Sequence, residues 1–567
     1  MISVSGNKWS QRKLNNRIIE KISIDNNLSY DLSKLILDRN YSLDEIKELE
    51  NEIQLNNPFF NNKDFLKAKN LLIKIIKKKE LVLIYGDYDV DGVCSTAILV
   101  NFFNYIKNPN YYLIPNRFND GYGPNLDLIK KNLKKNTKIV IFVDCGSNSA
   151  KIINFLKKNN IEVLIIDHHH INNKLASNLN IINPMKNPKD YMGQNICAAA
   201  LTFYLINFLN NELKKNINIY DFLFFALLGT ICDLMPLRHS NKHISKIALN
   251  KFNKIENPGI KQLLNFLSLK RSVSYTDISY SIGPMINSPG RLKDAKLSVE
   301  LLCSKNLNKI KKIVEEIQIL NVKRKKIENF CINLIDLKKY ENNDEVIFEE
   351  NELFHEGILG IIAGKLKDKL NRPAFVITES FNFYKGSIRS TGQFKLNNLL
   401  NKLLNFKLIE SGGGHNMAAG FVVKKENLIK LKEFINTEYR KSKKINTFYY
   451  DFKKLLPKDD SSIFIDLKKL EPFGHDNQQP LFLFENLKSI KTKIINNRHI
   501  NCILKNKEKR SFQSIAFDAV NTSIGNYLVN YKKKFSLIGT IDQYIWEGKK
   551  KNQIIIKDCL LVPSSIG

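Results

Sequence analysis

Short apolar runs alternate with helical segments between about residues 80 and 240. The runs at 81–86, 138–146 and 161–170 are continuous and rich in Val and Ile, as expected of strands that are buried on both faces. Segments 95–106 and 148–159 lie between them and have helical character. Alternation of strands and helices predicts a parallel sheet with helices on both faces. We therefore expect an α/β domain in this part of the chain.

The pattern changes twice further along the chain. Residues 291–340 contain neither Gly nor Pro and predict long amphipathic helices, whereas a mixed α/β region with Gly-rich turns follows from about 344 to 440. Five strand-like runs then predict a small β-barrel; they cover 480–495, 499–506, 510–519, 534–546 and 552–562. The expected organisation is α/β and multidomain: an N-terminal helical region (1–50), a parallel-sheet catalytic domain (51–290), a helical connector (291–340), a second α/β domain (341–440) and an OB-type β-barrel (445–567).

Three aspartates stand close together directly after the first apolar run, in the stretch IYGDYDVDGVCSTA. Alternate residues of a strand share one face, so we expect Asp87, Asp89 and Asp91 to converge at its carboxyl end. A calcium-binding EF-hand is excluded, because Ile98 stands at the twelfth loop position and a strand precedes the loop. Two unit charges about 4 Å apart repel by roughly 4 kcal/mol at an effective dielectric constant of 20. A cation, a protonation shift or solvent must relieve this repulsion.

Other acidic and imidazole side chains follow the neighbouring runs. Asp144 ends the second run, Asp167 and three histidines end the third, and Asp233 follows a long apolar segment. Ligands of parallel sheets bind beyond the carboxyl ends of the strands, so these groups are expected at one edge. Carboxylates with one or two imidazoles suit Mn²⁺ or Mg²⁺ better than a thiolate zinc site. A carboxylate shared by two such ions builds the paired-metal arrangement that cleaves phosphodiesters.

The chain is strongly basic, with 88 Lys and Arg against 56 Asp and Glu among 567 residues. A formal net charge of +32 favours a polyanionic partner such as nucleic acid, although Lys is also abundant in segments that look like ordinary surface. None of the eight cysteines forms a CxxC pair, so we expect neither a zinc knuckle nor a disulfide framework. The N-terminal segment has no signal-peptide core and no apolar run could span a bilayer, so a cytoplasmic protein without membrane contact is expected.

An ordered series of motifs resembles the DHH phosphoesterase superfamily. The four superfamily motifs are matched by DYDVDG (87–92), VDCG (143–146), DHH (167–169) and GTICDLMP (229–236). The nuclease branch and its DHHA1 domain are matched by PNRFNDGYG (115–123), GPMINSPGRL (283–292), HEGILGIIAGKL (355–366), GSIRSTG (386–392) and GGGHNMAAGF (412–421). LEPFGHDNQQPLFLFEN (470–486) is similar to the start of that branch's oligonucleotide-binding barrel.

The resemblance implies two divalent ions, Mn²⁺ or Mg²⁺, that share Asp144. One would be held by Asp89 and Asp144 with help from Asp87, and the other by Asp91, Asp144, His168 and Asp233. His169 would contact the scissile phosphate, and Asp167 would orient a neighbouring histidine. The implied catalytic residues are Asp89, Asp91, Asp144, His168, His169 and Asp233. His170 has no role in the family and is expected to be a surface or packing residue.

The resemblance also implies a site for the terminal phosphate of the substrate. Its residues would be Arg117, Ser387 and Arg389, and Arg291 is another candidate. His415, after a run of glycines, could contact the substrate from across the cleft. A guanidinium group can bind a terminal phosphate through two hydrogen bonds. The chain departs from the family at Met285, where GPMIN replaces the usual GPRIN, so one positive contact to DNA is missing.

Aromatic side chains in the barrel strands could stack on bases beside the Lys-rich strands. They are Phe482, Phe484, Phe512, Phe517, Tyr544 and Trp546. Because aromatics on alternating strands mostly belong to the core, we expect only a minority to face nucleic acid.

The family resemblance implies a metal-dependent exonuclease that degrades single-stranded DNA from the 5′ end to 5′-mononucleotides, in recombination and repair. The polarity comes from the resemblance alone. A phosphodiesterase for short oligonucleotides or cyclic dinucleotides is one alternative, but such relatives lack the barrel expected at 445–567. A non-catalytic DNA-binding replication factor is the other, but such relatives lose the metal carboxylates. Implied partners are a single-strand-binding protein and a RecQ-type helicase, and a monomer is expected.

Overall fold

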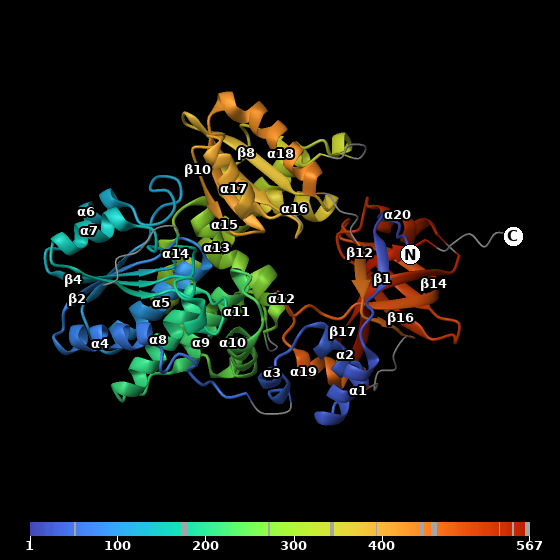
Figure 1. Cartoon of the computed structure of the whole chain (residues 1–567), viewed down its shortest axis with the longest axis horizontal. Coiled ribbons are helices and arrows are strands. Elements are labelled where there is room, and N and C mark those ends of the chain that lie inside the picture. The colour runs from blue at the N-terminus through green and yellow to red at the C-terminus, as the bar shows by residue number, and fades with distance from the viewer. Residues whose placement is uncertain are drawn as a thin grey trace. The chain divides into compact units, whose positions relative to one another are not determined.

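The computed structural model forms two compact units (Figure 1). The first contains residues 1–54, 236–239 and 445–567, and the second contains 55–235 and 240–444. The described residues are 1–49, 53–171, 179–269, 273–340, 345–392, 394–442, 447–454, 462–531, 533–546 and 549–561. Each unit is described by itself below.

The second unit contains the parallel sheet predicted from the apolar runs. Its strand order is β3-β2-β4-β5-β6, and every pair is parallel. The strands are β2 (Leu81–Tyr85), β3 (Asn110–Leu113), β4 (Thr137–Val143), β5 (Glu162–Ile166) and β6 (Asn180–Ile182). Tyr85 lies beside Phe142, and Val143 beside Ile166, so the three central strands end at one edge. The parallel sheet is thus confirmed.

Helices cover both faces of this sheet, as Figure 1 shows. Alternate strand residues enter two separate cores: Ile84 and Ile141 pack in one, whereas Leu83 and Val140 pack in the other. This division follows from the two-residue period of a strand. The first core includes α4 (Lys63–Lys77), α5 (Val90–Tyr105), α8 (Ala198–Glu212) and α9 (Ile219–Cys232). The second includes α6 (Leu126–Asn132) and α7 (Ala150–Lys158).

A series of helices follows, and its last two lie in the stretch 291–340, where the absence of Gly and Pro predicts helices. The helices of the series are α10 (His239–Asn250), α11 (Pro258–Phe266), α12 (Tyr275–Asp277), the π-helix η3 (Ile278–Ile282), α13 (Gly283–Leu292), α14 (Lys296–Cys303) and α15 (Leu307–Asn333). α15 is the long connector and has a buried polar cluster in its second half, where Arg324 donates to Glu328 at 2.8 Å. Lys365 of the next domain also pairs with Glu328. The first half of α15 shares an apolar core with the parallel sheet, and its end shares another with α16 and the strand at 374–380.

The second sheet of this unit belongs to the mixed α/β region. Its order is β10-β11-β9-β8-β7, antiparallel except for the β7–β8 pair. The strands are β7 (Ile347–Glu350), β8 (Ala374–Ser380), β9 (Phe383–Arg389), β10 (Ser411–Gly414) and β11 (Ala418–Val423). The helices are α16 (Leu359–Leu370), α17 (Leu396–Asn405) and α18 (Leu428–Ser442). α17 and α18 share one apolar core with the sheet, and α16 shares another with the end of α15.

The first unit joins the two ends of the chain. Strand β1 (Lys8–Gln11) pairs in parallel with β12 (Thr447–Tyr450). The helices α1 (Asn16–Asp25), α2 (Tyr30–Asp38) and α3 (Leu43–Lys47) precede the first break in the description. Residues Leu32 and Ile36 of α2 share a core with Leu467 and Phe482 from the C-terminal region.

A buried carboxylate fixes the N-terminal segment to the last strand. Asp558 accepts hydrogen bonds from Ser5 Oγ at 3.0 Å, from Asn7 Nδ2 at 3.2 Å and from Trp9 Nε1 at 2.9 Å. Trp9 itself is buried, against Phe448, Tyr450 and Leu483. A buried charge needs several donors to offset its desolvation, and this segment supplies three of them.

All five strands predicted in the C-terminal region are present. They are β14 (Phe482–Ile495), β15 (His499–Lys505), β16 (Ser511–Ala516), β17 (Phe535–Trp546) and β18 (Lys549–Leu560), accompanied by β13 (Phe452–Lys453), α19 (Ser462–Leu470) and α20 (Ser523–Asn530). Pairing runs β14-β15-β16-β18-β17 and returns from β17 to the first half of β14. This is the strand content expected of an OB-type domain.

Of the proposed stacking aromatics, four can be located in the structure and two of these are buried. Phe482 and Phe484 are buried in the core and Phe512 is half-buried, whereas Phe517 is 55% exposed. The side chains of Tyr544 and Trp546 lie outside the described residues. Burial removes Phe482 and Phe484 as candidates, and a contact of the others with nucleic acid stays a prediction.

Two further sequence-based expectations can be compared with the structure. All eight cysteines are free, so no disulfide forms. Among the described residues, no helix has the length and apolar character needed to cross a bilayer.

Candidate active site

The acidic loop after β2 is a helix start rather than a continued strand. β2 ends at Tyr85 and α5 begins at Val90, so the expectation that Asp87, Asp89 and Asp91 alternate along a strand is wrong. The carboxylate of Asp89 is the N-cap of α5 and accepts from the amides of Asp91 at 2.9 Å and Gly92 at 3.1 Å. Capping satisfies two amides that a helix start leaves without partners. The turn, not strand alternation, brings the three carboxylates together.

Asp91 is held by the start of another helix. Its two carboxylate oxygens accept from the amides of Ala198 at 2.7 Å and Ala199 at 2.9 Å, in the first turn of α8. Helix α9 passes close by at Gly229, where a Cβ would lie 2.4 Å from Asp91 Oδ1. Only glycine permits this approach, which places Asp233, at the end of α9, beside the same carboxylate.

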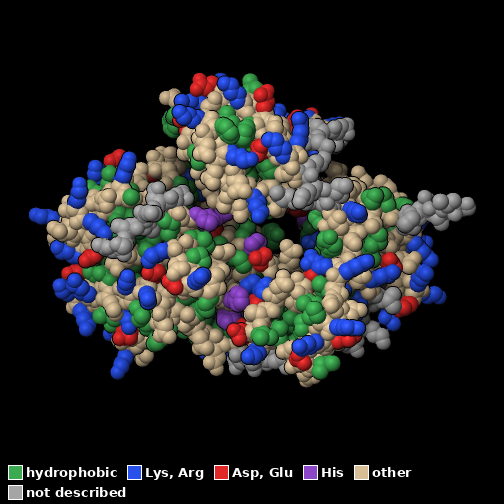
Figure 2. Space-filling model, in the orientation of Figure 1, with side chains coloured by type: hydrophobic (Ala, Val, Ile, Leu, Met, Phe, Trp, Pro, Cys, Tyr) green, Lys and Arg blue, Asp and Glu red, His purple; other side chains and the backbone are tan. Residues whose placement is uncertain are grey.

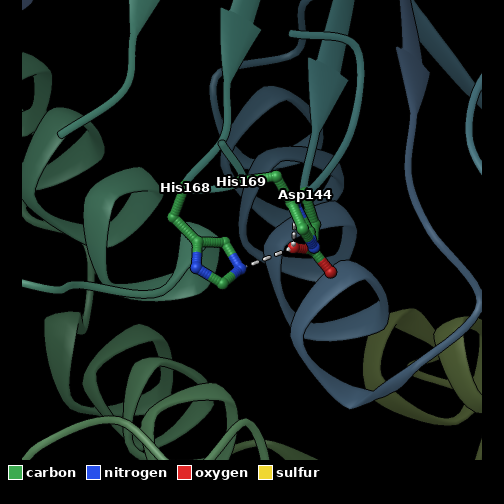
Figure 3. Close-up of side chains that lie close together, drawn as sticks. All are labelled: Asp144, His168 and His169. Atoms are coloured by element: carbon green, nitrogen blue, oxygen red, sulfur yellow. Dashed lines mark hydrogen bonds and ion pairs between the residues drawn. The ribbon is translucent and has the colours of Figure 1, made fainter. Parts of the chain in front are cut away.

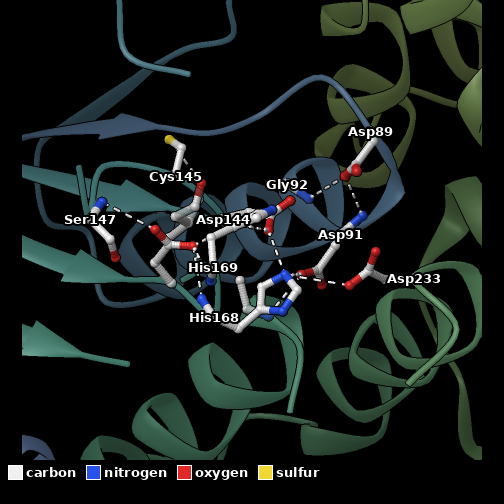
Figure 4. A network of polar contacts seen from close by, with 12 residues as sticks. Asp89, Asp91, Gly92, Asp144, Cys145, Ser147, His168, His169 and Asp233 are labelled. Atoms are coloured by element: carbon white, nitrogen blue, oxygen red, sulfur yellow. Dashed lines mark hydrogen bonds and ion pairs between the residues drawn. The ribbon is translucent and has the colours of Figure 1, made fainter. Parts of the chain in front are cut away.

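The carboxylates and imidazoles predicted as metal ligands meet at the carboxyl edge of the sheet (Figure 4). Three sets have ligand atoms within 4.8 Å of one another: Asp87, Asp89 and Asp144; Asp91, His168 and Asp233; Asp144, His168 and His169. Asp144 and His168 each belong to two of these sets, and the sharing of Asp144 by two ions stays a prediction. Asp144 has a left-handed backbone conformation (φ 61°), which is uncommon for a residue other than glycine.

His168 lies at the centre of this group. Its Nε2 is 3.1 Å from Asp144 Oδ1, 3.4 Å from Asp233 Oδ2 and 3.7 Å from Asp91 Oδ2 (Figures 3 and 4). Burial lowers the pKa of His168 well below its usual value, with a smaller contribution from the neighbouring His169. A neutral imidazole has a lone pair available for a metal ion.

The carboxylates at this edge are poorly neutralised by the protein. Burial first, and neighbouring aspartates second, raise the pKa of Asp87 to about 7 and that of Asp91 to about 6. The same causes raise the pKa values of Asp144 and Asp233. Asp87 Oδ1 and Asp233 Oδ2 are buried without a hydrogen-bond partner among the described residues. Buried oxygens of this kind, with one imidazole, fit divalent ions that prefer oxygen ligands.

His169 is held differently from His168. Its Nδ1 lies 2.8 Å from Asp167 Oδ1 and its Nε2 lies 2.9 Å from the hydroxyl of Tyr122. Burial opposes the charged form, but the hydrogen bond to Asp167 raises the pKa of His169 to about 9. Asp167 also accepts from the amides of Ser147, His168 and His169, so it orients both histidines. His170 is exposed, and its carbonyl accepts from Asn148 Nδ2.

The arginines predicted to bind phosphate also lie close together. Arg117 donates from Nε to the carbonyl of Gly290 at 3.1 Å, and Arg291 donates from Nη1 to the carbonyl of Gly357 at 3.1 Å. Arg389 donates from Nη1 to Ser387 Oγ at 3.2 Å. A Cβ at Gly360 would lie 2.8 Å from Arg389 Nη2 and 3.2 Å from Ser387 Oγ, so both side chains pack on the first turn of α16. A helix start adds favourable potential for anions.

The arginine cluster is also poorly neutralised by the protein, but its charge is positive. Burial, together with Arg117, Arg389 and Arg324, lowers the pKa of Arg291 to about 9, and burial lowers that of Arg389. In the described part of the chain, no carboxylate forms an ion pair with Arg117, Arg291 or Arg389, whereas Arg324 is paired with Glu328. Three poorly neutralised guanidinium groups form a site for a multiply charged anion.

His415 approaches the metal centre from the second sheet. It stands in the turn between β10 and β11, and its ring lies nearly parallel to that of His169 with centroids 5.6 Å apart. The distance to the ring of His168 is 6.2 Å. The structure therefore brings every predicted site residue into one of two neighbouring groups, the metal centre with His415 or the arginine cluster.

Two residues at the site were not identified from the sequence. The ring of Tyr88 lies 4.0 Å beneath the guanidinium of Arg117, and Tyr122 contacts His169. Both lie within motifs, DYDVDG and PNRFNDGYG, but an aromatic residue gives no chemical signal of its own. Met285 is buried in the apolar core, so packing replaces the positive charge that the family pattern would place there.

Three domain families match the chain in sequence order. The DHH family N-terminal domain matches residues 81–230, the DHHA1 domain matches 343–441 and the RecJ OB domain matches 455–558. The chain therefore carries a DHH family N-terminal domain, followed by a DHHA1 domain and a RecJ OB domain, in the order that the motifs predicted.

Curated relatives of the chain include single-stranded-DNA-specific exonucleases named RecJ. The protein of Bacillus subtilis (strain 168) is 27% identical over 510 residues, which cover 88% of this chain and 64% of the relative. That of Escherichia coli (strain K12) is 27% identical over 402 residues, covering 67% and 70%. The chain thus spans about two thirds of the length of these relatives.

A solved structure shares the fold of the chain. RecJ from Thermus thermophilus in complex with Mn²⁺ matches with a TM-score of 0.81, at 21% identity, covering 97% of this chain and 79% of that one. A structure of the same protein with Mg²⁺ matches with a TM-score of 0.76. At this identity the match concerns the fold, and it supports the domain architecture described above.

Proposed function

We propose that the chain is a metal-dependent exonuclease that hydrolyses single-stranded DNA from its 5′ end and releases 5′-mononucleotides. The observation behind the proposal is the pairing of two groups with opposite charge, each left unneutralised by the protein. The guanidinium carbon of Arg117 lies 4.0 Å from the centroid of the ring of Tyr88, which stands between Asp87 and Asp89, so the two groups are neighbours. A phosphodiester chain with bound divalent ions would neutralise both at once. The names of the relatives support this substrate.

The carboxylate group would hold two divalent ions, Mn²⁺ or Mg²⁺. Asp87, Asp89 and Asp144 would hold one, and Asp91, His168 and Asp233 the other. Asp144, whose Oδ1 lies 3.1 Å from His168 Nε2, would be shared by both. When bound, such ions activate water and offset the charge that develops on a phosphodiester during hydrolysis. The chain's own residues orient this site: Asp89 by capping α5, and Asp91 through the amides of α8. His169, fixed by Asp167, would contact the scissile phosphate together with His415.

The arginine cluster would bind the 5′-terminal phosphate. A terminal monoester has more charge than an internal diester, so buried cations beside a helix start would favour a chain end over its interior. Arg117, Arg291, Arg389 and Ser387 would supply the contacts, and the distance from this cluster to the metal centre would set the length of the product. The 5′ polarity of the proposal depends on this assignment.

Digestion of end-labelled single strands tests the proposal. Strands labelled at either end are incubated with Mn²⁺ or Mg²⁺, and the products are identified by mass. We expect mononucleotides to appear from the 5′ end first, with Asp89→Ala inactive and Glu162→Gln, at the exposed amino end of β5, fully active. Release from the 3′ end would contradict the polarity. Cleavage confined to dinucleotides would instead favour a phosphodiesterase of short oligonucleotides, and DNA binding without cleavage a replication factor.

Other sequence-based predictions stay proposals. A cytoplasmic location, a monomeric state, and contacts with a single-strand-binding protein or a RecQ-type helicase are family expectations. The domain boundaries at residues 50, 290, 340 and 440 also stay predictions, since compactness groups the chain into two units that cross them.

A further inference from the structure

Tyr88 stands at the junction of the two charged groups. It lies between Asp87 and Asp89 in the sequence, and its side chain is only 9% exposed. The guanidinium carbon of Arg117 lies 4.0 Å from the centroid of its ring. The residue that separates two proposed metal ligands therefore contacts a proposed phosphate ligand directly.

The contact between Tyr88 and Arg117 is part of a small rigid assembly. Helix α13 approaches the loop so closely at Gly290 that a Cβ there would lie 2.3 Å from the carbonyl oxygen of Tyr88. The carbonyl of the same Gly290 accepts the hydrogen bond from Arg117 Nε at 3.1 Å. On its other side, Tyr88 meets Tyr122 edge to face, with centroids 6.3 Å apart, and Tyr122 contacts His169. Tyr88 is thus fixed from three directions.

An aromatic ring is suited to holding an arginine that must bind an anion. A carboxylate partner would neutralise the guanidinium and compete with the phosphate. The face of a ring attracts the cation without neutralising it. The hydrogen bond to Gly290 uses Nε and the ring covers one face, so neither contact uses Nη1 or Nη2.

We propose that Tyr88 is a positioning residue that fixes Arg117 relative to the metal centre, and thereby sets where the terminal phosphate is held. The inference rests on the proposed function. The aromatic ring, and not the hydroxyl, provides the contact. Tyr88→Phe should therefore keep the contact with Arg117. Tyr88→Leu should fill the same space but lose the contact of the ring with the guanidinium group.

Binding of 5′-phosphorylated and 5′-hydroxyl single strands, measured by fluorescence anisotropy in EDTA, tests the inference without cleavage. We expect the wild type and Tyr88→Phe to prefer the phosphorylated strand equally, and Tyr88→Leu to lose that preference by roughly fivefold or more, the scale of a buried cation–π contact. Tyr41→Leu is the matched control: Tyr41 is 8% exposed and lies under Arg238 at 4.6 Å in the other unit. It should keep the preference.

Calorimetry with Mn²⁺ distinguishes a displaced Arg117 from a loss of structure in the loop that contains Asp87 and Asp89. Tyr88→Leu should bind Mn²⁺ as the wild type does and, with Mn²⁺ present, should release di- and trinucleotides beside mononucleotides. An unchanged phosphate preference in Tyr88→Leu would overturn the inference, as would a parallel loss of Mn²⁺ binding and of binding to both strands. If the wild type binds with a phosphate preference but cleaves nothing, the proposed function fails while the test of Tyr88 still stands.

Discussion

The metal centre and the arginine cluster are neighbours with opposite charge, but they are built in different ways. The carboxylates come from the ends of strands and helices around one sheet, so a single domain positions them. The arginines come from three segments: the loop after β3, the end of α13 and strand β9 of the second sheet. The first group depends on one fold, and the second depends on how two sheets of one unit pack together. Damage to one should therefore be separable from damage to the other.

The largest effect is expected from removing the shared carboxylate. Asp144→Asn keeps the shape of the side chain but removes the charge that two ions would share, so kcat should fall by about a thousandfold or more. Calorimetry should show weakened Mn²⁺ binding, whereas the preference for a 5′-phosphate should persist. Glu162→Gln serves as the control. Normal turnover in Asp144→Asn would remove the basis for the shared-metal site.

Metal removal should make stability depend on pH. Without ions, Asp87 and Asp91 have pKa values of about 7 and 6, above those of an unfolded chain. The folded state then holds protons that the unfolded state releases, so the free energy of unfolding should fall as pH rises from about 4 to 7.

Divalent ions bind the ionised carboxylates and should offset this loss. The stabilisation by Mn²⁺ should grow with pH by on the order of 3 kcal/mol. Thermal unfolding with Mn²⁺ or with EDTA, at steps between pH 5 and 8, measures the difference. A difference that stays constant with pH would show that these carboxylates do not bind the ions.

Truncation of an arginine in the arginine cluster should weaken the binding of the 5′-phosphate and leave the metal centre unchanged. Arg389→Ala should reduce the preference for 5′-phosphorylated over 5′-hydroxyl strands roughly 10- to 100-fold, the value of hydrogen bonds to a charged group. Binding of Mn²⁺ should not change. Arg440→Ala, an exposed residue paired with Glu345 in the same domain, is the control. If Arg389→Ala weakened Mn²⁺ binding, the two groups would not be independent.

The smallest effect is expected at the third histidine of the motif. His170 is exposed and its ring makes only a distant contact with His415, at 6.3 Å. His170→Gln should change kcat less than about twofold, whereas His169→Gln should lower it at least about a hundredfold. Measurement of kcat for both variants under the same conditions tests this difference. A large loss in His170→Gln would assign a role to a residue that neither the family pattern nor the structure supports.

The metal centre was largely predictable because its signals are local. Continuous Val and Ile runs identify the strands, and a carboxylate after each strand must lie at the carboxyl edge. The prediction was wrong about the strand itself. β2 ends at Tyr85, and a loop and the start of α5, capped by Asp89, follow where alternation of the three aspartates requires a continued strand. Periodicity cannot show where a strand gives way to a helix start.

The arginine cluster could be predicted only through motifs. Among 88 Lys and Arg residues, nothing in the chemistry of Arg117 or Arg389 distinguishes them from the basic side chains spread over the face in Figure 2. Tyr88 was missed because its importance lies in a contact with a residue 29 positions away. The joining of the two chain ends through Trp9 and Asp558 gave no signal at all, since the partners are 549 positions apart.

The buried contact between Trp9 and Asp558 has a practical consequence for spectroscopy. The chain contains only two tryptophans, Trp9 and Trp546, and both belong to the first unit. Tryptophan emission therefore reports the unfolding of the first unit, while the second unit, which contains the candidate active site, unfolds without a tryptophan signal. Helix-sensitive circular dichroism would follow that unit instead. The two probes, recorded in one titration, would show whether the units unfold together or separately.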